Sequence, residues 1–393
     1  MLCRKRPLFP QSQRYDQRRA MHRRRVASPT TRVVKMDPKI WSLLPRELLE
    51  HILSFLPLRA FLILRSTCKH FNSLLFTPSF VSKHSSRSLS SFLLLSHPHC
   101  HQHYPLYDSA AGTWHSSALS PSLLLPNFKN SSLISSSNGL LCFSLPNSSS
   151  FLICNLLTKS WREIKFPSFP FVFELLTFVS TPKLGYKIFI LACGSSRFEA
   201  FLYDSRFHSW QKVNGFDRIL GYTHHQEGVY FDGHLYFATS EPFSIICFNP
   251  EAGTTEHRGS ELLPPPDELT FARLVSDGGE RLYLVGGIGA NGISRGMKLW
   301  ALCRGGGRWE EVESLPELVC RKFMSVCYHN YEHVYCFWHQ GMVCICCYTW
   351  PEILYYRASR RTWHWLPKCP SLPEKWSCGF KWYSFLPEIS AMA

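Results

Sequence analysis

The spacing of hydrophobic residues predicts helices near the start of the chain and strands after them. In the stretch LLPRELLEHILSFLPL (43–58), apolar side chains recur at positions 45, 48, 49, 52, 53 and 56, which form one stripe on a 3.6-residue helix. Pro45 suits the first turn of that helix, because its missing N–H has no helical partner there, and Pro57 ends the helix. A second segment, 58–76, has helical spacing through Phe61, Leu62, Leu64, Cys68, Phe71, Leu74 and Leu75.

This helical segment is too small to bury its own apolar surface. Residues 41–76 form a unit of the size that usually needs a metal, a disulfide or a partner, since units below roughly 40 residues rarely fold alone. The helices therefore either pack on the rest of the chain or present their stripe to another protein. The hydrophobic pattern by itself leaves both readings open.

A short motif then recurs six times, and each copy reads as a strand, a turn and a second strand. In every copy the last residue, usually Trp, lies six positions after the second residue, and successive copies end 45 to 54 residues apart. Asp108, Asn155, Asp204 and Asn249 occupy the second position, where their side chains can cap the turn. The copies are YDSAAGTW (107–114), CNLLTKSW (154–161), YDSRFHSW (203–210), FNPEAGTT (248–255), LCRGGGRW (302–309) and YRASRRTW (356–363).

Another apolar segment precedes most copies, for example GYKIFILAC (185–193) and ERLYLVGG (280–287). Two hairpin strands plus one or two more in each repeat match one four-stranded propeller blade. The sequence therefore favours an all-β propeller of six blades after the helices, with CGFKWYSFL (378–386) pairing with SFLLLS (91–96) to close the ring. An irregular β-sandwich is the alternative, but it does not explain why the last residue lies six positions after the second residue in all six copies.

Charge is concentrated in the N-terminal tail. The net charge is +15, yet residues 1–35 hold eleven Lys or Arg and one acidic residue, whereas 88–393 hold 25 basic and 24 acidic residues. The near-neutral remainder argues against a broad nucleic-acid-binding face. No apolar run approaches the roughly 18 residues that a membrane helix needs, and no apolar signal-peptide core is present at the N-terminus. We expect neither a nucleic-acid partner nor a membrane.

The helical segment resembles the F-box. The residues that carry the resemblance are LPREL (44–48), ILSFLP (52–57) and RSTCKHFNSLL (65–75), although Phe71 stands where many F-boxes carry Trp. The resemblance implies docking to the Skp-type adaptor of a cullin–RING ubiquitin ligase. It makes these residues candidates for adaptor contact or for packing between the helices: Leu44, Pro45, Leu48, Leu49, Ile52, Leu53, Leu56, Leu62 and Phe71.

The repeats resemble kelch repeats, and an F-box followed by kelch-like repeats is a plant architecture. The kelch double glycine is clear only at Gly286–Gly287, and the fourth copy has Thr255 in place of Trp. Together the resemblances imply the substrate-recognition subunit of a Skp–cullin–F-box (SCF) ubiquitin ligase, whose propeller loops capture a target protein. A kelch scaffold that binds partners without marking them for ubiquitination is the alternative. We expect no enzyme activity and no cofactor.

Three motifs suggest other chemistry but fit a structural role better. Gly287-x-Gly289-x-x-Gly292 matches a dinucleotide fingerprint, yet a strand-like segment follows instead of the helix that binds pyrophosphate, so we interpret these glycines as a loop. His97, His99, Cys100, His101 and His103 crowd one polar loop, whereas zinc sites usually take separated pairs. Alternation predicts a buried strand hairpin for the set Cys336, His339, Cys344 and Cys347.

The predicted domains are a basic disordered tail (1–35), a helical F-box domain (36–87) and a kelch-like propeller (88–393). Translation from Met36 would leave the tail out. Sixteen cysteines without a secretory signal indicate a reducing compartment. We expect the protein in the nucleus, the cytoplasm or both, with organelle import through the Arg-rich tail as an alternative.

Overall fold

The structure is a computed structural model. It describes residues 39–40, 43–56, 58–85, 90–100, 103–115, 118–119, 131–168, 170–181, 185–193, 198–214, 226–239, 243–252, 254–256, 269–303, 308–372 and 377–393. The predicted basic tail, 1–35, lies outside the described residues. The chain divides into two compact units, Met1–Leu49 and Glu50–Ala393. In the described residues no helix is both long and apolar enough to cross a bilayer.

The helical segment contains more and shorter helices than the spacing alone predicts. The 58–76 stretch is interrupted at Ser66–Cys68, where the Ser66 and Thr67 hydroxyls donate to the carbonyls of Ile63 and Leu64. Such side-chain bonds compete with the helical ladder. Cys68 then caps the next helix, because its Sγ accepts a bond from Phe71 N. The helical elements are α2 (Arg46–Ser54), α3 (Leu58–Arg65), α4 (Lys69–Ser73), η1 (Leu74–Phe76) and α5 (Pro78–Ser85).

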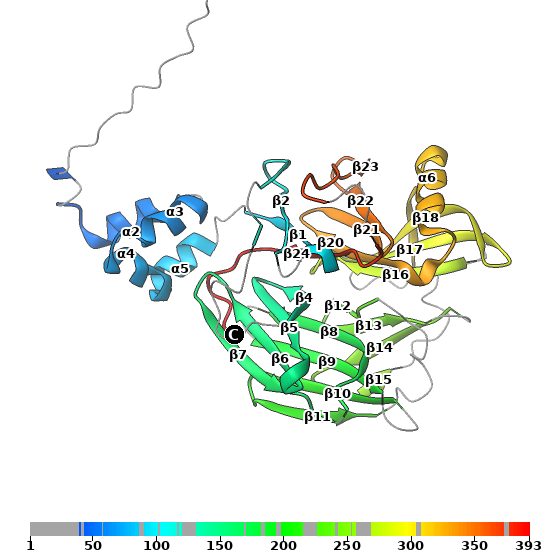
Figure 1. Ribbon diagram of the computed structural model, residues 1–393, viewed down its shortest axis with the longest axis horizontal. Coiled ribbons are helices and arrows are strands. Elements are labelled where there is room, and N and C mark those ends of the chain that lie inside the picture. The colour runs from blue at the N-terminus through cyan, green and yellow to red at the C-terminus, as the bar shows by residue number, and fades with distance from the viewer. Residues whose placement is uncertain are drawn as a thin grey trace, which may run out of the picture. The chain divides into compact units, whose positions relative to one another are not determined.

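Strands make up most of the remaining described residues, and within these ranges they form six four-stranded antiparallel sheets (Figure 1). The sheets are the blades of a six-bladed propeller, as the repeats predict. In chain order the strands are β1 (Phe92–Ser96), β2 (Leu106–Asp108), β3 (Thr113–Trp114), β4 (Ser132–Ser137), β5 (Leu140–Leu145), β6 (Ser150–Asn155), β7 (Ser160–Lys165), β8 (Phe173–Thr181), β9 (Gly185–Cys193), β10 (Phe198–Asp204), β11 (Ser209–Val213), β12 (Val229–Phe231), β13 (His234–Ala238), β14 (Ile245–Asn249), β15 (Thr254–Glu256), β16 (Leu269–Ser276), β17 (Arg281–Ala290), β18 (Ile293–Cys303), β19 (Glu310–Ser314), β20 (Val334–His339), β21 (Met342–Cys347), β22 (Trp350–Arg357), β23 (Thr362–Trp365) and β24 (Lys381–Phe385).

The first blade closes the ring, as predicted. It has the strand order β24-β1-β2-β3, so that the last strand of the chain pairs with the first. The register runs from Phe92 opposite Phe385 to Ser96 opposite Lys381. The second to sixth blades are β4–β7, β8–β11, β12–β15, β16–β19 and β20–β23. Helix α6 (Glu317–Cys327) lies between the fifth and sixth blades in the sequence and buries Cys320, Phe323 and Met324.

Five of the six repeated motifs join the two outer strands of a blade and contribute residues to both, whereas in the fifth copy residues 304–307 lie outside the described residues and Trp309 directly precedes β19. The residue before the turn-capping position pairs with the aromatic position, as in Tyr107 with Trp114, Cys154 with Trp161 and Tyr203 with Trp210. Asp108 Oδ1 accepts the N–H groups of residues 110 and 111, and Asn249 Oδ1 accepts those of residues 251 and 252. Asn155 and Asp204 make the corresponding bond. The predicted turn caps are therefore confirmed.

One sequence interpretation differs in part from the structure. Of the three glycines interpreted as a loop, Gly287 and Gly289 lie within β17, whereas Gly292 does lie in the turn to β18, beside Asn291, and both turn residues have positive φ. A side chain at Gly287 would meet Ser294, Thr270 and Phe271, so packing rather than a turn requires this glycine. At the aromatic position of the motif, Trp161 of the second copy is exposed.

The histidine- and cysteine-rich segments have structural roles. Cys336, His339, Cys344 and Cys347 lie in the predicted β20–β21 hairpin, and they do not converge because Cys344 packs in a different core cluster from Cys336 and Cys347. His97 is buried, stacks on Phe380 at 4.2 Å and bonds Ser377 O. Among the described residues, no group of three or more His, Cys, Asp or Glu side chains could hold a metal ion.

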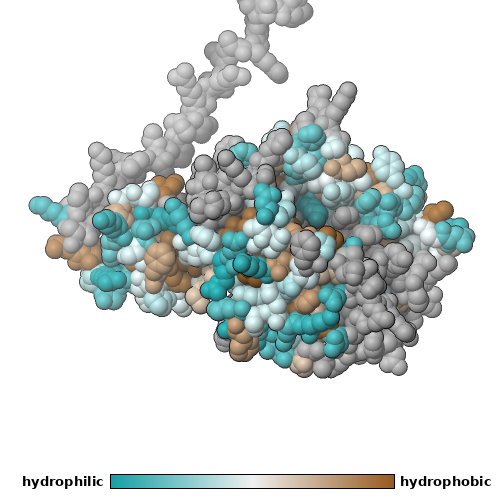
Figure 2. Space-filling model, turned by 60° about the horizontal axis from the view of Figure 1, so that its bottom comes forward, coloured by the Kyte–Doolittle hydropathy of each residue, from teal (hydrophilic) through white to brown (hydrophobic). Residues whose placement is uncertain are grey.

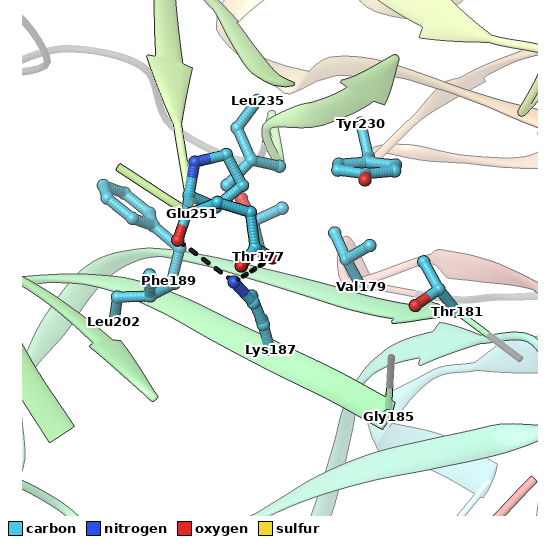
Figure 3. A pocket seen from close by; sticks show the side chains of 11 residues that line it. Thr177, Val179, Thr181, Gly185, Lys187, Phe189, Leu202, Tyr230, Leu235 and Glu251 are labelled. Carbon is cyan, nitrogen blue, oxygen red and sulfur yellow. Dashed lines mark hydrogen bonds and ion pairs between the residues drawn. The ribbon is translucent and has the colours of Figure 1, made fainter. Parts of the chain in front are cut away.

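Neighbouring blades are joined by charged side chains. Arg273 on β16 donates from Nε to Val334 O at 2.6 Å and from Nη2 to Tyr331 O at 2.5 Å, which links the fifth blade to the sixth. Lys187 Nζ on β9 lies 2.6 Å from Glu251 Oε1, beside a pocket between the third and fourth blades (Figure 3). That pocket has about 20 Å³, room for roughly one water molecule. It therefore belongs to the packing between blades.

Candidate functional site

Helix α2 begins at Arg46, so Pro45 directly precedes the first turn, in which the sequence predicts it. The carbonyl of Pro45 accepts bonds from Leu48 N at 3.1 Å and Leu49 N at 3.0 Å, so the proline occupies the position before the first helical turn. Glu47 lies in that first turn, where a negative charge favours the helix dipole. Leu53 is buried on the opposite end of the helix, near Ser54, whose hydroxyl donates to His51 O.

The helical segment has a small core of its own. Phe61 and Phe80 are fully buried with ring centroids 4.9 Å apart, and His84 packs beside both rings. Leu53, Leu74 and Leu75 are also buried. The residues that hold these helices together are therefore a defined subset of the apolar positions.

Other apolar side chains of the helical segment, on its helices and in its turns, remain exposed, and brown hydrophobic atoms are visible on this part of the surface (Figure 2). Single exposed apolar residues are ordinary, but several on consecutive short helices indicate an interaction surface. The large exposed ones are Leu43 (81% exposed), Leu48 (46%), Phe55 (61%), Ile63 (63%) and Phe76 (65%).

The propeller contains a second candidate site, a cavity of about 550 Å³. Its walls come from the edge strands β4, β8, β12, β16, β20 and β24, one from each blade. Its charged lining residues among the described positions are Glu227, Asp277 and Lys381. The cavity therefore lies along the axis of the ring and carries both signs of charge.

Comparison with known proteins identifies both parts. The F-box domain model matches residues 41–83, and the model of the F-box associated beta propeller domain matches residues 106–301. F-box/kelch-repeat protein At5g43190 of Arabidopsis thaliana is 54% identical over 373 residues, which cover 93% of this chain and 91% of that protein. The chain belongs to the F-box/kelch-repeat family. F-box proteins of this kind are generally non-catalytic adaptors, and an F-box supports binding to a Skp-type adaptor.

More distant relatives share the same extent of chain. F-box only protein 6 of Arabidopsis thaliana is 25% identical over 85% of this chain and 71% of that protein. Protein UNUSUAL FLORAL ORGANS of the same plant is 24% identical over 85% of this chain and 80% of that protein. The similarity in each case spans most of the chain and is not confined to the F-box.

The predicted F-box positions differ in burial. Leu53 is buried, whereas Pro45 and Leu48 are exposed. The side chain of Leu62 lies outside the described residues. The remaining predicted positions are half-buried, and they are Leu44, Leu49, Ile52, Leu56 and Phe71.

Sequence reasoning missed the exposed residues Phe55, Ile63 and Phe76. Phe55 falls outside the stripe through positions 45, 48, 49, 52, 53 and 56, and that departure is the signal that could have identified it. Ile63 and Phe76 lie in segments so rich in apolar residues that spacing cannot say which of them faces outward. In the structure Ile63 lies two residues after the buried Phe61 on α3, and Phe76 is the last residue of η1.

Proposed function

We propose that this protein is the substrate-recognition subunit of an SCF ubiquitin ligase. The F-box binds a Skp-type adaptor and, through it, the cullin and RING subunits. The propeller captures a target protein with the loops that its rigid blades position. Ubiquitin transfer would then follow from holding a target lysine near a charged conjugating enzyme, so no residue of this chain acts in the chemistry.

The observation that carries the proposal is the exposure of four large apolar side chains in a helical segment whose core is made by other residues. They are Leu48 on α2, Phe55 in the turn after it, Ile63 on α3 and Phe76 in η1. Since buried residues such as Phe61 and Phe80 already pack these helices, exposed side chains such as Leu48 can contact another protein. Large apolar side chains at the centre of an interface often carry most of its binding energy. We therefore assign adaptor contact to these four and to the neighbouring half-buried positions.

Leu48→Asp tests the assignment directly. Leu48 is the third residue of α2, where an aspartate suits the helix dipole and the side chain is exposed, so the free protein should fold normally. Burying the new carboxylate against the adaptor without a partner would be unfavourable by at least several kcal/mol. We expect co-elution with a co-expressed plant Skp-type adaptor to be lost while the melting temperature stays unchanged.

Leu318→Asp is the matched control. Leu318 is an exposed leucine in the first turn of α6, far along the chain from the F-box, and its substitution introduces the same charge in the same helical context. It should leave adaptor binding intact. If the Leu48→Asp protein bound the adaptor with wild-type affinity, the assignment of Leu48 to the adaptor interface would be wrong. A well-folded wild-type chain that never binds the adaptor would favour the non-degradative kelch scaffold instead.

A further inference from the structure

The cavity on the propeller axis has the size of a small-molecule site. Its volume of about 550 Å³ falls within the range of roughly 300–1,000 Å³ that is usual for ligand pockets. Aromatic side chains form part of its wall, among them Trp338, which stacks on Tyr283 with centroids 5.6 Å apart. The wall is therefore partly apolar, and Tyr283, which is not a lining residue, packs against Trp338.

Most polar groups of the lining are already used to hold blades together. Ser136 Oγ donates to Ser384 O at 2.9 Å, and Ser137 Oγ accepts from Ser180 N at 2.9 Å. Tyr335 OH donates to Phe380 O and accepts from Trp382 N. Asp277, the third charged lining residue, accepts three backbone N–H groups of its own turn. These groups leave little capacity for a ligand.

Glu227 is placed differently, since its carboxyl group bonds a residue of another blade that also lines the cavity. Ser135 on β4 of the second blade donates to Glu227 Oε2 at 2.8 Å, although Glu227 precedes β12 of the fourth blade. The backbone that carries it is fixed on both sides. Gln226 Nε2 donates to Leu274 O of the fifth blade, and Gly228 N donates to Thr177 Oγ1 of the third.

Lys381, the first residue of β24, supplies the opposite charge. Each of the two side chains shifts the pKa of the other, yet in the described residues no ion pair within 4.0 Å joins them. Burial raises the pKa of Glu227 to about 7 and lowers the pKa of Lys381. Both effects mean that the charged forms lack the solvation they would have in water, so each would gain from a counter-charge.

We propose that the central cavity binds a small zwitterion of the α-amino-acid class, with its ammonium group at Glu227, its carboxylate at Lys381 and an apolar or aromatic side chain against the cavity wall. A ligand with both charges fits because Glu227 and Lys381 both line the cavity and no ion pair within 4.0 Å joins these two described residues. A simple cation or anion would satisfy only one of the two groups.

The test uses the full chain without any adaptor, so that its outcome does not depend on the proposed ligase role. L-Tryptophan and L-phenylalanine are titrated by calorimetry and by thermal shift, beside tryptophan amide, which lacks the carboxylate, and N-acetyltryptophan, which lacks the ammonium group. We expect at least one free amino acid to bind and raise the melting temperature. Removing either charge from that ligand should weaken binding at least tenfold.

Glu227→Gln and Lys381→Met assign the two ends of the ligand. The first should abolish the preference for the amino acid over its N-acetyl form, and the second the preference over its amide. Glu199→Gln and Lys212→Met are the matched controls, because these residues form an ion pair on β10 and β11, outside the lining of the cavity, and should change nothing. The proposal would be overturned if neither amino acid bound, if the modified forms bound as tightly as the free amino acid, or if both cavity variants bound it with wild-type affinity.

Discussion

His339 is one residue that bonds the sixth blade to the first blade. It is the last residue of β20 and is fully buried, with Nε2 2.5 Å from Ser109 Oγ and Nδ1 2.8 Å from Ser384 Oγ. Ser109 follows β2 and Ser384 lies in β24, both in the first blade. A neutral imidazole offers one donor and one acceptor, and each serine hydroxyl can supply the complementary group. The sixth blade is thereby bonded to the strand that closes the ring.

This contact predicts sensitivity to acid. Burial lowers the pKa of His339 from 6.5 to about 4. As the pH falls below 6.5, the unfolded chain binds a proton that the folded protein does not take up until about pH 4, so the free energy of unfolding falls across this window. The shift corresponds to about 3 kcal/mol.

His339→Gln should remove that loss. Urea unfolding at pH 7.5 and pH 4.5 gives the change in unfolding free energy for each protein, and carboxylates common to both cancel in the comparison. We expect the wild type to lose about 2–3 kcal/mol more than the variant. Equal losses would show that His339 is protonated in the folded protein at the lower pH.

At the scale of the element, the β17–β18 hairpin depends on glycines for packing. Gly287→Ala would place a Cβ 2.6 Å from Phe271 Cε1 and against the hydroxyls of Ser294 and Thr270. Overpacking of this kind destabilises by about 1–3 kcal/mol. Gly296 in β18 is the control, since a Cβ there meets nothing within 4 Å and φ is not positive.

Thermal unfolding of the two variants separates packing from chain entropy. Gly296→Ala should be neutral or stabilising by up to about 1 kcal/mol, because it restricts only the unfolded chain. Gly287→Ala should melt several degrees lower than the wild type. If both variants melted together, the close approach at Gly287 would not be what requires a glycine there.

The outer hairpins were predictable because their determinants are local. Asp108 and Asn249 cap turns with their own side chains, and a fixed count of residues brings the pairing position opposite Trp114 or Thr255. Burial is not local, however. Trp161 and Trp309 occupy the same motif position, yet the first is exposed and the second buried, because their surroundings come from other segments.

For the whole molecule, ring closure was predictable and the cavity was not. Two apolar segments at the ends of the repeats need partners for their edges, which makes pairing of 91–96 with 378–386 the natural solution. The sequence around Glu227 and around Lys381 does not indicate that the two residues line one cavity, since they come from different blades and belong to no repeated motif. Only the assembled ring brings them to one cavity.

Strand β24, which closes the ring, should be needed for a stable and soluble protein. Deleting Lys381–Ala393 removes five residue pairs with β1 and the buried side chains of Trp382, Tyr383 and Phe385. It also removes the bond from Tyr383 OH to Leu133 O and the two bonds from Asn155 Nδ2 to Glu388 O and Ala391 O, which connect the C-terminal segment to the second blade. An unpaired β1 would then be an open edge, which favours aggregation.

We expect the truncated protein to lose its cooperative thermal transition and to aggregate, and a synthetic peptide of residues 378–393 added during refolding to restore solubility. Deletion of residues 1–35 is the comparison at the other end of the chain. That tail has no apolar stripe, so its removal should leave both the melting temperature and adaptor binding unchanged. A soluble truncated protein that melts within a few degrees of the wild type would mean that the remaining blades hold the ring without β24.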